Sequence, residues 1–166
     1  MNTKKAQNIG AKLAVKSMVI GLIIAQSIMT LLASSDGFLK GFLWFLHDDF
    51  FINIIIAIVI SLIVSYYIGR LAGKHILINK KNHILIGIGS GLLILFLSSF
   101  LSSWVGFFQE GIDNIGTNDN PFFDYIFKPV YWVSLFGLIP VLIVGTVYGI
   151  QINKHKEIEN PADNML

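Results

Sequence analysis

The sequence predicts an all-α integral membrane protein, a bundle of four transmembrane helices with both termini in the cytoplasm. Of the 166 residues, 54% are hydrophobic and only 13% are charged, which is far more apolar than the balance of soluble domains. The apolar residues also fall into four long runs, and about 20 mainly apolar residues are enough for a helix to cross the hydrocarbon core of a bilayer. The third observation is an uneven distribution of charge between the segments that join these runs.

Four apolar runs give the predicted spans, and no segment between them is long enough to form a soluble core of its own. Residues 1–166 are therefore expected to form one polytopic membrane domain. A lysine-rich leader precedes the first span, and residues 153–166 are expected to form a flexible cytoplasmic tail. The predicted transmembrane helices cover residues 17–33, 52–71, 83–105 and 131–152.

Positive charges set the predicted orientation. If the N-terminus is cytoplasmic, ten of the 12 lysines and arginines lie inside, and only Lys40 and Lys128 lie outside. Seven of the ten acidic residues then lie outside. Short loops that carry an excess of lysine and arginine stay in the cytoplasm. The sequence therefore predicts a multi-pass protein of the bacterial inner membrane with both termini inside.

The first outer loop, residues 36–51, is rich in phenylalanine and leucine that can share one helical face. We expect a short helix lying in the membrane interface, with Trp44 among its anchors. His47, Asp48 and Asp49 form the compact titratable cluster of this loop and are a candidate pH or cation site. Adjacent residues point in different directions on a helix, so a solvated face is the stronger alternative.

Small residues recur at a spacing of four in every span, which places them on one side of each helix. Such faces let the backbones of neighbouring helices approach closely. All of them fall toward the cytoplasmic side, so that half of the bundle is expected to be the more tightly packed. The predicted packing residues are Gly21, Ala25, Ser65, Gly69, Gly73, Gly87, Gly91, Gly145 and Gly149.

A faint internal repeat accompanies these faces. Residues 62–69 resemble residues 142–149, and residues 21–24 resemble residues 91–94. The two halves would then be parallel helical hairpins produced by duplication. Chance matches between apolar segments are the alternative explanation.

The short inner loop holds a group of cations. Arg70, Lys74, Lys80 and Lys81 lie in or beside it. An anchor that keeps the loop in the cytoplasm is one explanation. A docking surface for an acidic cytosolic partner or for lipid headgroups is the other.

The third span carries serines on one side. Ser90, Ser98 and Ser102 lie roughly along one wall of the helix and are candidate pore-lining residues in an oligomer. Serines in membrane helices also bond their own preceding carbonyls, which is the structural alternative. No acidic or basic residue lies in the central turns of any span, which disfavours an ion-coupled carrier.

The second outer loop, residues 106–129, mixes acidic and amide residues and then becomes aromatic again. We expect a second interfacial segment that folds over the outer mouth of the bundle. The regular ligand spacing of an EF-hand loop is absent from the sequence.

Enzymatic motifs are absent from the sequence. The segment Gly87-Ile88-Gly89-Ser90-Gly91 has isoleucine at the position where the serine motif of rhomboid proteases requires glycine, and there is no HExxH motif or phosphate-binding loop. The chain has no cysteine, which excludes thiolate metal sites and cysteine nucleophiles. We therefore expect no enzyme and no cofactor.

Two function classes remain after these exclusions. The first is a non-enzymatic inner-membrane subunit that acts as anchor, sensor or immunity factor. It would work through self-assembly as a homo-oligomer and through a cytosolic or envelope protein partner. The second is an oligomeric pore or small-solute channel. Membrane lipids are expected contacts in both, and no segment is basic enough to indicate nucleic-acid binding.

In helix number, length and predicted orientation the chain is similar to colicin-type immunity proteins and to membrane subunits of bacterial anti-phage systems. No residue motif is shared with either group. The resemblance implies only that a four-helix membrane protein of this size suits bacteriocin immunity or anti-phage defence.

The predicted orientation can be tested by labelling, because the chain has no native cysteine. A membrane-impermeant maleimide should label Asp113→Cys in intact cells, since residue 113 is predicted to lie outside. Thr3→Cys and Asn79→Cys should be labelled only after permeabilisation. Labelling of Asn79→Cys in intact cells would contradict the orientation.

Overall fold

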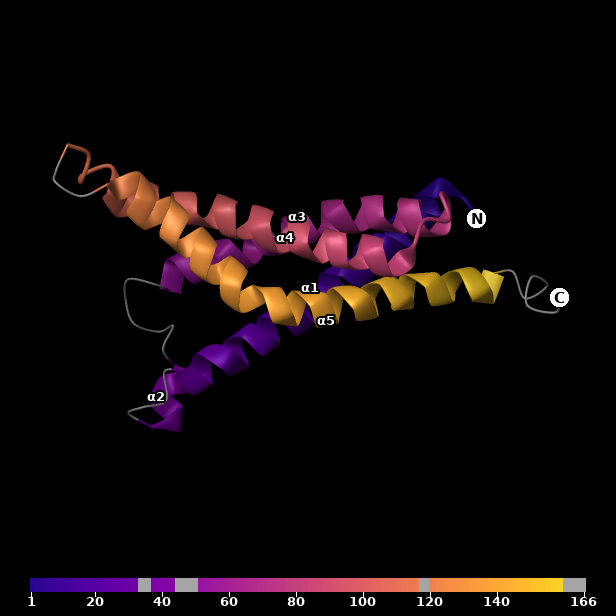
Figure 1. The fold of residues 1–166 in the computed structure, drawn as a ribbon, viewed down its shortest axis with the longest axis horizontal. Helices are drawn as coiled ribbons and strands as arrows, with labels where there is room; N and C mark the ends of the chain where they lie inside the picture. The colour runs from indigo at the N-terminus through magenta and orange to yellow at the C-terminus, as the bar shows by residue number, and fades with distance from the viewer. Residues whose placement is uncertain (33–36, 44–50, 117–119, 160–166) are drawn as a thin grey trace.

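The computed structural model describes residues 1–32, 37–43, 51–116 and 120–159. All regular secondary structure in these ranges is helical, and four helices are long and apolar enough to cross a membrane, which confirms the predicted all-α class. Figure 1 shows the start of α1 and the end of α5 at one end of the bundle, together with the connection from α3 to α4. The four long helices are α1 (Thr3–Leu32), α3 (Phe51–Leu77), α4 (His83–Gly106) and α5 (Lys128–Glu159).

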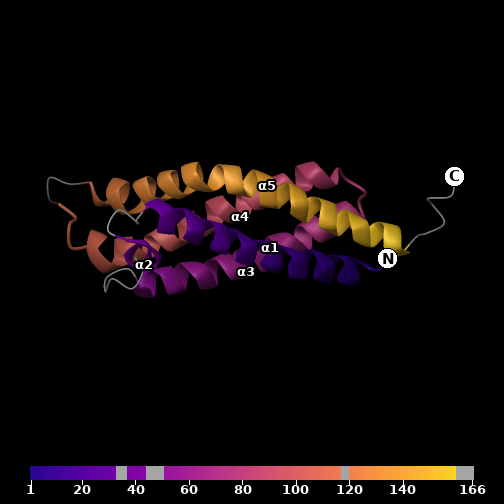
Figure 2. The ribbon, with the colours of Figure 1, turned by 90° about the horizontal axis from the view of Figure 1, so that it is seen from below.

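We call the end of the bundle that carries both termini and the 78–82 loop the basic end, because Lys4, Lys80 and Lys154 lie there. Figure 2 shows the four long helices running along a common axis from this end. The main cluster of buried apolar residues also lies here and draws on α1, α3 and α5. Its members are Ala6, Ala14, Ala72, Ile76, Leu77, Tyr148 and Ile152.

The first helix is longer than predicted. α1 begins at Thr3, whereas the predicted span begins at residue 17. The lysine-rich leader is helical because Ala6, Gly10 and Ala14 form a small-residue face that is buried in the bundle. Tertiary packing of this kind stabilises helix where hydropathy alone gives no signal.

The last helix also passes its predicted boundary. α5 extends to Glu159, so residues 153–159 are helical and not part of a flexible tail. The residues beyond Ile152 include lysine and glutamate, which favour helix. Residues 160–166 of the predicted tail lie outside the described residues.

Helical turns of π type extend α4 and α5 into the second outer loop. They are η3 (Phe107–Gly111) and η4 (Phe123–Phe127). The start of the second extension is fixed by Asn120, whose side-chain oxygen accepts the amide of Phe123, with Pro121 in the first helical turn. Among the described residues, the segment predicted to be interfacial thus continues α4 and α5 as helix.

The first outer loop contains the short helix α2 (Phe38–Phe42). The Gln26 side chain of α1 donates a hydrogen bond to the Phe42 carbonyl oxygen at 2.9 Å, which ties α2 to α1. The described helix is five residues long. Trp44, the predicted anchor, lies outside the described residues.

Glycine brings α1 and α3 into backbone contact near the basic end. A Cβ atom on Gly10 would lie closer than 3.0 Å to the Gly69 carbonyl oxygen and to Gly73 backbone atoms. Gly73 in turn faces the Ala6 carbonyl oxygen, and Gly69 faces Ala14. Real Cβ atoms do not adopt such separations, so this antiparallel pair requires glycine at all three positions.

The same arrangement joins α4 and α5. A Cβ atom on Gly87 would lie closer than 3.0 Å to the Gly145 carbonyl oxygen and to Gly149 backbone atoms. Gly149 faces the carbonyl oxygen of His83. Gly91 is in ordinary contact with Gly145, and a Cβ atom there would meet Val141 Cγ1 at 3.0 Å.

The two contacts share one register. Gly10 corresponds to Gly87 and Ala6 to His83, while Gly69 corresponds to Gly145 and Gly73 to Gly149. The predicted repeat paired residues 62–69 with 142–149, which is displaced by one helical turn from this correspondence. The register in the structure is set by the glycines that contact each other. The sequence match instead aligned neighbouring apolar residues, which recur often because the chain is rich in them.

The opposite end of the bundle is more open. In Figure 1, α1 diverges from the other helices toward α2. Its second half is largely exposed, with Ile23 62% and Leu31 71% accessible, whereas Ala6 is fully buried. The predicted packing positions in this half make no close contact, because a Cβ atom on Gly21 would meet nothing within 4 Å and Ala25 is exposed.

Figure 1 also shows that α5 is bent. Pro140 lies inside this helix and has no amide hydrogen for the carbonyl four residues earlier. Gly137, in the preceding turn, accommodates Leu95 of α4, whose Cδ1 would lie 2.7 Å from a Cβ atom there. The bend thus occurs where the two helices approach each other closely.

Glycine-to-alanine substitutions should have opposite effects on stability at the packed and at the open glycine positions. Gly10→Ala and Gly87→Ala should each lower the free energy of unfolding by about 1–3 kcal/mol, because the added methyl group forces the backbones apart. Gly21→Ala and Gly89→Ala should be neutral or stabilising by up to about 1 kcal/mol, since both sites are open and alanine favours helix. Unfolding titrations with a denaturing detergent measure the difference, and equal effects at both kinds of site would contradict the packing.

Candidate functional site

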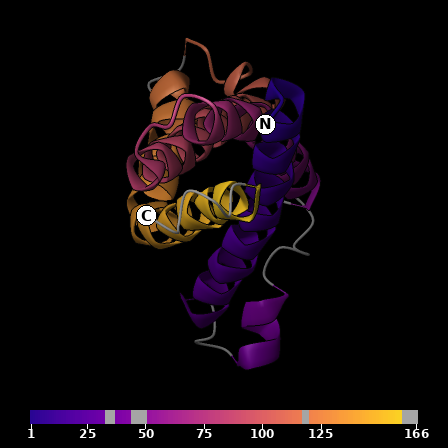
Figure 3. The same cartoon turned by 90° about the vertical axis from the view of Figure 1, so that its right-hand side faces the viewer.

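The basic end combines exposed cations with the tightest packing in the described chain. Figure 3 shows this end facing the viewer, with α1 passing obliquely beside α5. Three kinds of residue meet here. They are the lysines of the 78–82 turn, an arginine between α1 and α3, and a buried tyrosine between the two hairpins.

Backbone hydrogen bonds order the turn from α3 to α4. The Asn79 amide donates to the Lys74 carbonyl oxygen and the Lys81 amide to the His75 carbonyl oxygen, both at 3.1 Å. Lys80 adopts a left-handed conformation with φ 49°. The turn therefore has a defined backbone and is not a loose linker.

A side-chain cap completes this turn. The Asn82 side-chain oxygen accepts hydrogen bonds from the Ile84 and Leu85 amides at the start of α4. Asparagine is a preferred residue at this position, because it satisfies amides that have no partner inside the helix. The cap fixes the point at which the chain turns back into the bundle.

The predicted docking cations separate into two groups. Lys74, Lys80 and Lys81 are exposed around the turn. Arg70 instead faces α1, where its guanidinium donates to the Gln7 side-chain oxygen at 3.2 Å. The same guanidinium lies 5.8 Å from the centre of the Tyr66 ring. Arg70 thus connects α1 and α3, and only the three lysines form an outward surface.

Tyr148 joins the two helical hairpins. Its side chain is 2% exposed, and its hydroxyl donates to the Gly10 carbonyl oxygen at 3.2 Å. The Gly69 carbonyl oxygen lies 3.5 Å from the same hydroxyl. A residue of α5 thereby contacts both carbonyls at the point where α1 and α3 approach most closely.

Sequence reasoning missed Ala6, Gly10, Ala14 and Tyr148. The alanine and glycine positions do carry a signal, since they repeat at a spacing of four. The lysines around them are instead typical of a basic leader. Tyr148 carries no local signal, because its partner Gly10 lies 138 positions away in the sequence.

Besides Tyr148, the buried residues with polar side chains in the described part of the chain are serine and threonine. Most of them bond carbonyls of their own helix, as Ser61 does with Ala57 and Ser65 with Leu62. Such bonds satisfy the hydroxyl without joining neighbouring helices. Ser65 therefore contributes to packing by its small size.

The candidate pore serines do not share one exposed wall. Ser90 is 9% and Ser98 6% exposed, so both lie inside a single copy of the chain. Ser102 is half-buried and donates to the Ser98 carbonyl oxygen at 2.6 Å. The Ser98 hydroxyl is buried and has no hydrogen-bond partner within the described part of the chain.

Aromatic packing closes the opposite end between α4 and α5. Trp104 contacts the rings of Phe107, Phe108 and Phe122 at centroid separations of 5.5 to 5.9 Å. The Tyr125 hydroxyl donates to the Glu110 carboxylate at 3.1 Å. These contacts hold the two extended helices together but bring no set of titratable groups into one cavity.

Metal binding has no support in the described residues. They contain no group of three or more histidine, aspartate or glutamate side chains that could hold an ion. His47, Asp48 and Asp49, the candidate outer pH or cation site, lie outside the described residues. That candidate therefore stays a prediction.

Comparison of the chain with protein-family models, with curated proteins and with solved structures finds no match. The function is therefore argued from the geometry of the basic end.

The Tyr148 contact predicts a selective loss of stability. Tyr148→Phe should lower the free energy of unfolding by about 0.5–1.5 kcal/mol, because it removes one buried hydrogen bond and leaves the ring in place. Tyr67→Phe is the matched control, since its side chain is 61% exposed. Unfolding titrations of both variants compare the two hydroxyls, and an equal response would rule out a special role for Tyr148.

Proposed function

We propose that the chain is a non-enzymatic subunit of the bacterial inner membrane that binds a cytosolic protein through the exposed lysines of its basic end. The observation that supports this function most directly is the ordered 78–82 turn with Lys80 and Lys81, beside Lys74 in the last turn of α3. Neither α3 nor α4 contains an aspartate or glutamate that could neutralise them. The partner is expected to present an acidic surface.

The geometry of the interior supports a subunit and not an enzyme. Most buried polar groups of the described residues are hydroxyls bonded within their own helix, and Asn53 adds one buried amide oxygen. Catalysis by general acids, bases or metals requires titratable or ligating groups that converge on a substrate. An anchor requires only stable packing and one accessible surface, and both are present at the basic end.

Roles as anchor, sensor or immunity factor all fit this arrangement. The four helices fix the turn at a constant position relative to the bundle, so a bound partner would be held at the membrane surface. Bacterial anti-phage defence and bacteriocin immunity are examples of processes that use such subunits. The identity of the acidic partner decides among them.

Self-assembly is a further part of this proposal. The glycine faces of α3, α4 and the first half of α1 are already occupied within one chain. Gly21 and Ala25 on the divergent half of α1 remain accessible. A homo-oligomer would therefore use this half of α1 and leave the lysines of the turn free for the partner.

The alternative of an oligomeric pore has weaker support. It requires Ser90, Ser98 and Ser102 to face an axis shared between copies. Two of these serines are buried in a single copy, so the bundle would have to open before they could line a common channel. The subunit function needs no such rearrangement.

Charge reversal at the turn tests the proposed function. The full chain should be purified from its native host in mild detergent, with the Lys80→Glu and Lys81→Glu double variant in parallel. The wild type should retain a soluble partner in fixed stoichiometry, and the double variant should lose it because like charges repel the acidic surface. Retention should also fall at high salt, since exposed charges are screened.

The control for this experiment is the Lys4→Glu and Lys154→Glu double variant, which makes the same change of charge at the same end of the bundle but on α1 and α5. It should keep the partner. A wild type without a stoichiometric soluble companion, or equal retention by both double variants, would contradict the proposal.

A further inference from the structure

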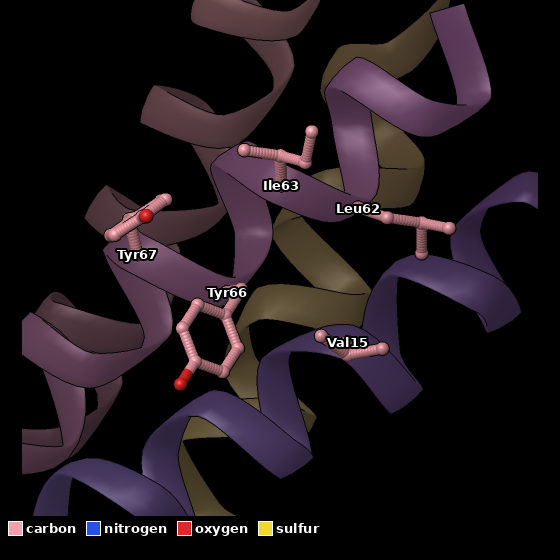
Figure 4. Close-up of a pocket in the computed structure, with 5 residues that line it drawn as sticks. All are labelled: Val15, Leu62, Ile63, Tyr66 and Tyr67. Carbon is pink, nitrogen blue, oxygen red and sulfur yellow. The ribbon is translucent and has the colours of Figure 1, made fainter.

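A shallow apolar groove of about 430 Å³ lies between α1 and α3. Its walls are Val15 of α1 and Leu62, Ile63, Tyr66 and Tyr67 of α3, shown in Figure 4. The lining side chains are accessible, with Ile63 52%, Tyr66 43% and Tyr67 61% exposed. The groove therefore opens on the outer surface of the bundle and not into its core.

Positive charge stands at one end of this groove. Arg70 follows Tyr66 by four residues, so it lies one helical turn, about 5.4 Å, closer to the basic end. Its guanidinium is over the Tyr66 ring that forms the groove wall. On α1, Lys12 precedes Val15 by three residues, lies on the same side of that helix and is exposed.

No carboxylate on α1, α3 or α4 offsets this charge. The sequences of α1, α3 and α4 contain neither aspartate nor glutamate. Arg70 is half-buried, and its hydrogen bond to Gln7 uses one of the five donors of a guanidinium. A partly buried cation of this kind is stabilised by an anion.

We propose that the groove binds a phospholipid with an acidic headgroup. One acyl chain lies against Val15, Ile63 and Tyr66, and the phosphate is held by Lys12 and Arg70. The groove is apolar along its length and positive at its basic end, which matches an anionic lipid better than a soluble anion or a neutral lipid. Arginine is well suited to this role because its planar donors match a phosphate group.

This inference is independent of the proposed protein partner. The lipid site uses Lys12, Arg70 and the groove, whereas the docking surface uses Lys74, Lys80 and Lys81. Either can fail without the other. A lipid bound here would also pack against both α1 and α3.

Native mass spectrometry of the full chain in detergent tests the site. Phosphatidylglycerol and phosphatidylcholine with identical acyl chains serve as probes. The wild type should retain one phosphatidylglycerol in preference to phosphatidylcholine. Lys12→Gln and Arg70→Gln should each reduce phosphatidylglycerol retention roughly fivefold, because each removes one cation near the headgroup.

Three comparisons make the result specific. Retention of phosphatidylcholine should not change in Lys12→Gln, which also shows that this surface variant is folded. Lys74→Gln, with its cation outside the groove, should retain phosphatidylglycerol like the wild type. Ile63→Trp should reduce retention of both lipids, because the larger side chain fills the groove.

The proposal is overturned if the wild type shows no preference for phosphatidylglycerol. It is also overturned if Lys12→Gln and Arg70→Gln retain this lipid as well as the wild type does. A loss of equal size in Lys74→Gln would show a general effect of positive charge and would likewise contradict a defined site.

Discussion

The close approach of helix backbones at glycine is the constraint on which the rest of the structure depends. Gly10 with Gly69, and Gly87 with Gly145, leave no room for a side chain. In a lipid environment apolar burial gives little net preference for helix association, so close van der Waals contact has to supply it. The two glycine contacts make each hairpin a compact unit at the basic end and leave the opposite end free to diverge.

Tyr148 links the two hairpins by a buried hydrogen bond. Its hydroxyl reaches the carbonyl oxygen of Gly10, which is accessible because that contact lacks side chains. The glycine contact and the tyrosine contact are therefore linked. A fixed bundle in turn positions the 78–82 turn with its exposed lysines and the groove beside Arg70, so the proposed binding surfaces depend on the same packing.

Hydropathy predicted four helices and their order, because apolar length is a strong signal in the sequence. Gly69, Gly73, Gly87, Gly145 and Gly149 were also identified from their spacing. For α1, the packing contact was predicted at Gly21 and not at Ala6 and Gly10. The small-residue face at Ala6 and Gly10 lies in a lysine-rich segment, which hydropathy does not identify as part of a span. The sequence also could not predict that Arg70 differs from the exposed lysines. Arg70 faces α1 because it bonds Gln7, which lies 63 positions away in the sequence.

A double-mutant cycle on Gly10 and Tyr148 tests most directly whether the Tyr148 hydrogen bond depends on the glycine contact between α1 and α3. Free energies of unfolding would be measured for the wild type, Gly10→Ala, Tyr148→Phe and the combined variant. If the alanine methyl group moves α1 away from α3, Tyr148 loses its acceptor, and Tyr148→Phe should then cost almost nothing in the Gly10→Ala background. The expected coupling is about 0.5–1.5 kcal/mol. Strictly additive losses would contradict the account, because they would mean that Tyr148 does not depend on the glycine contact.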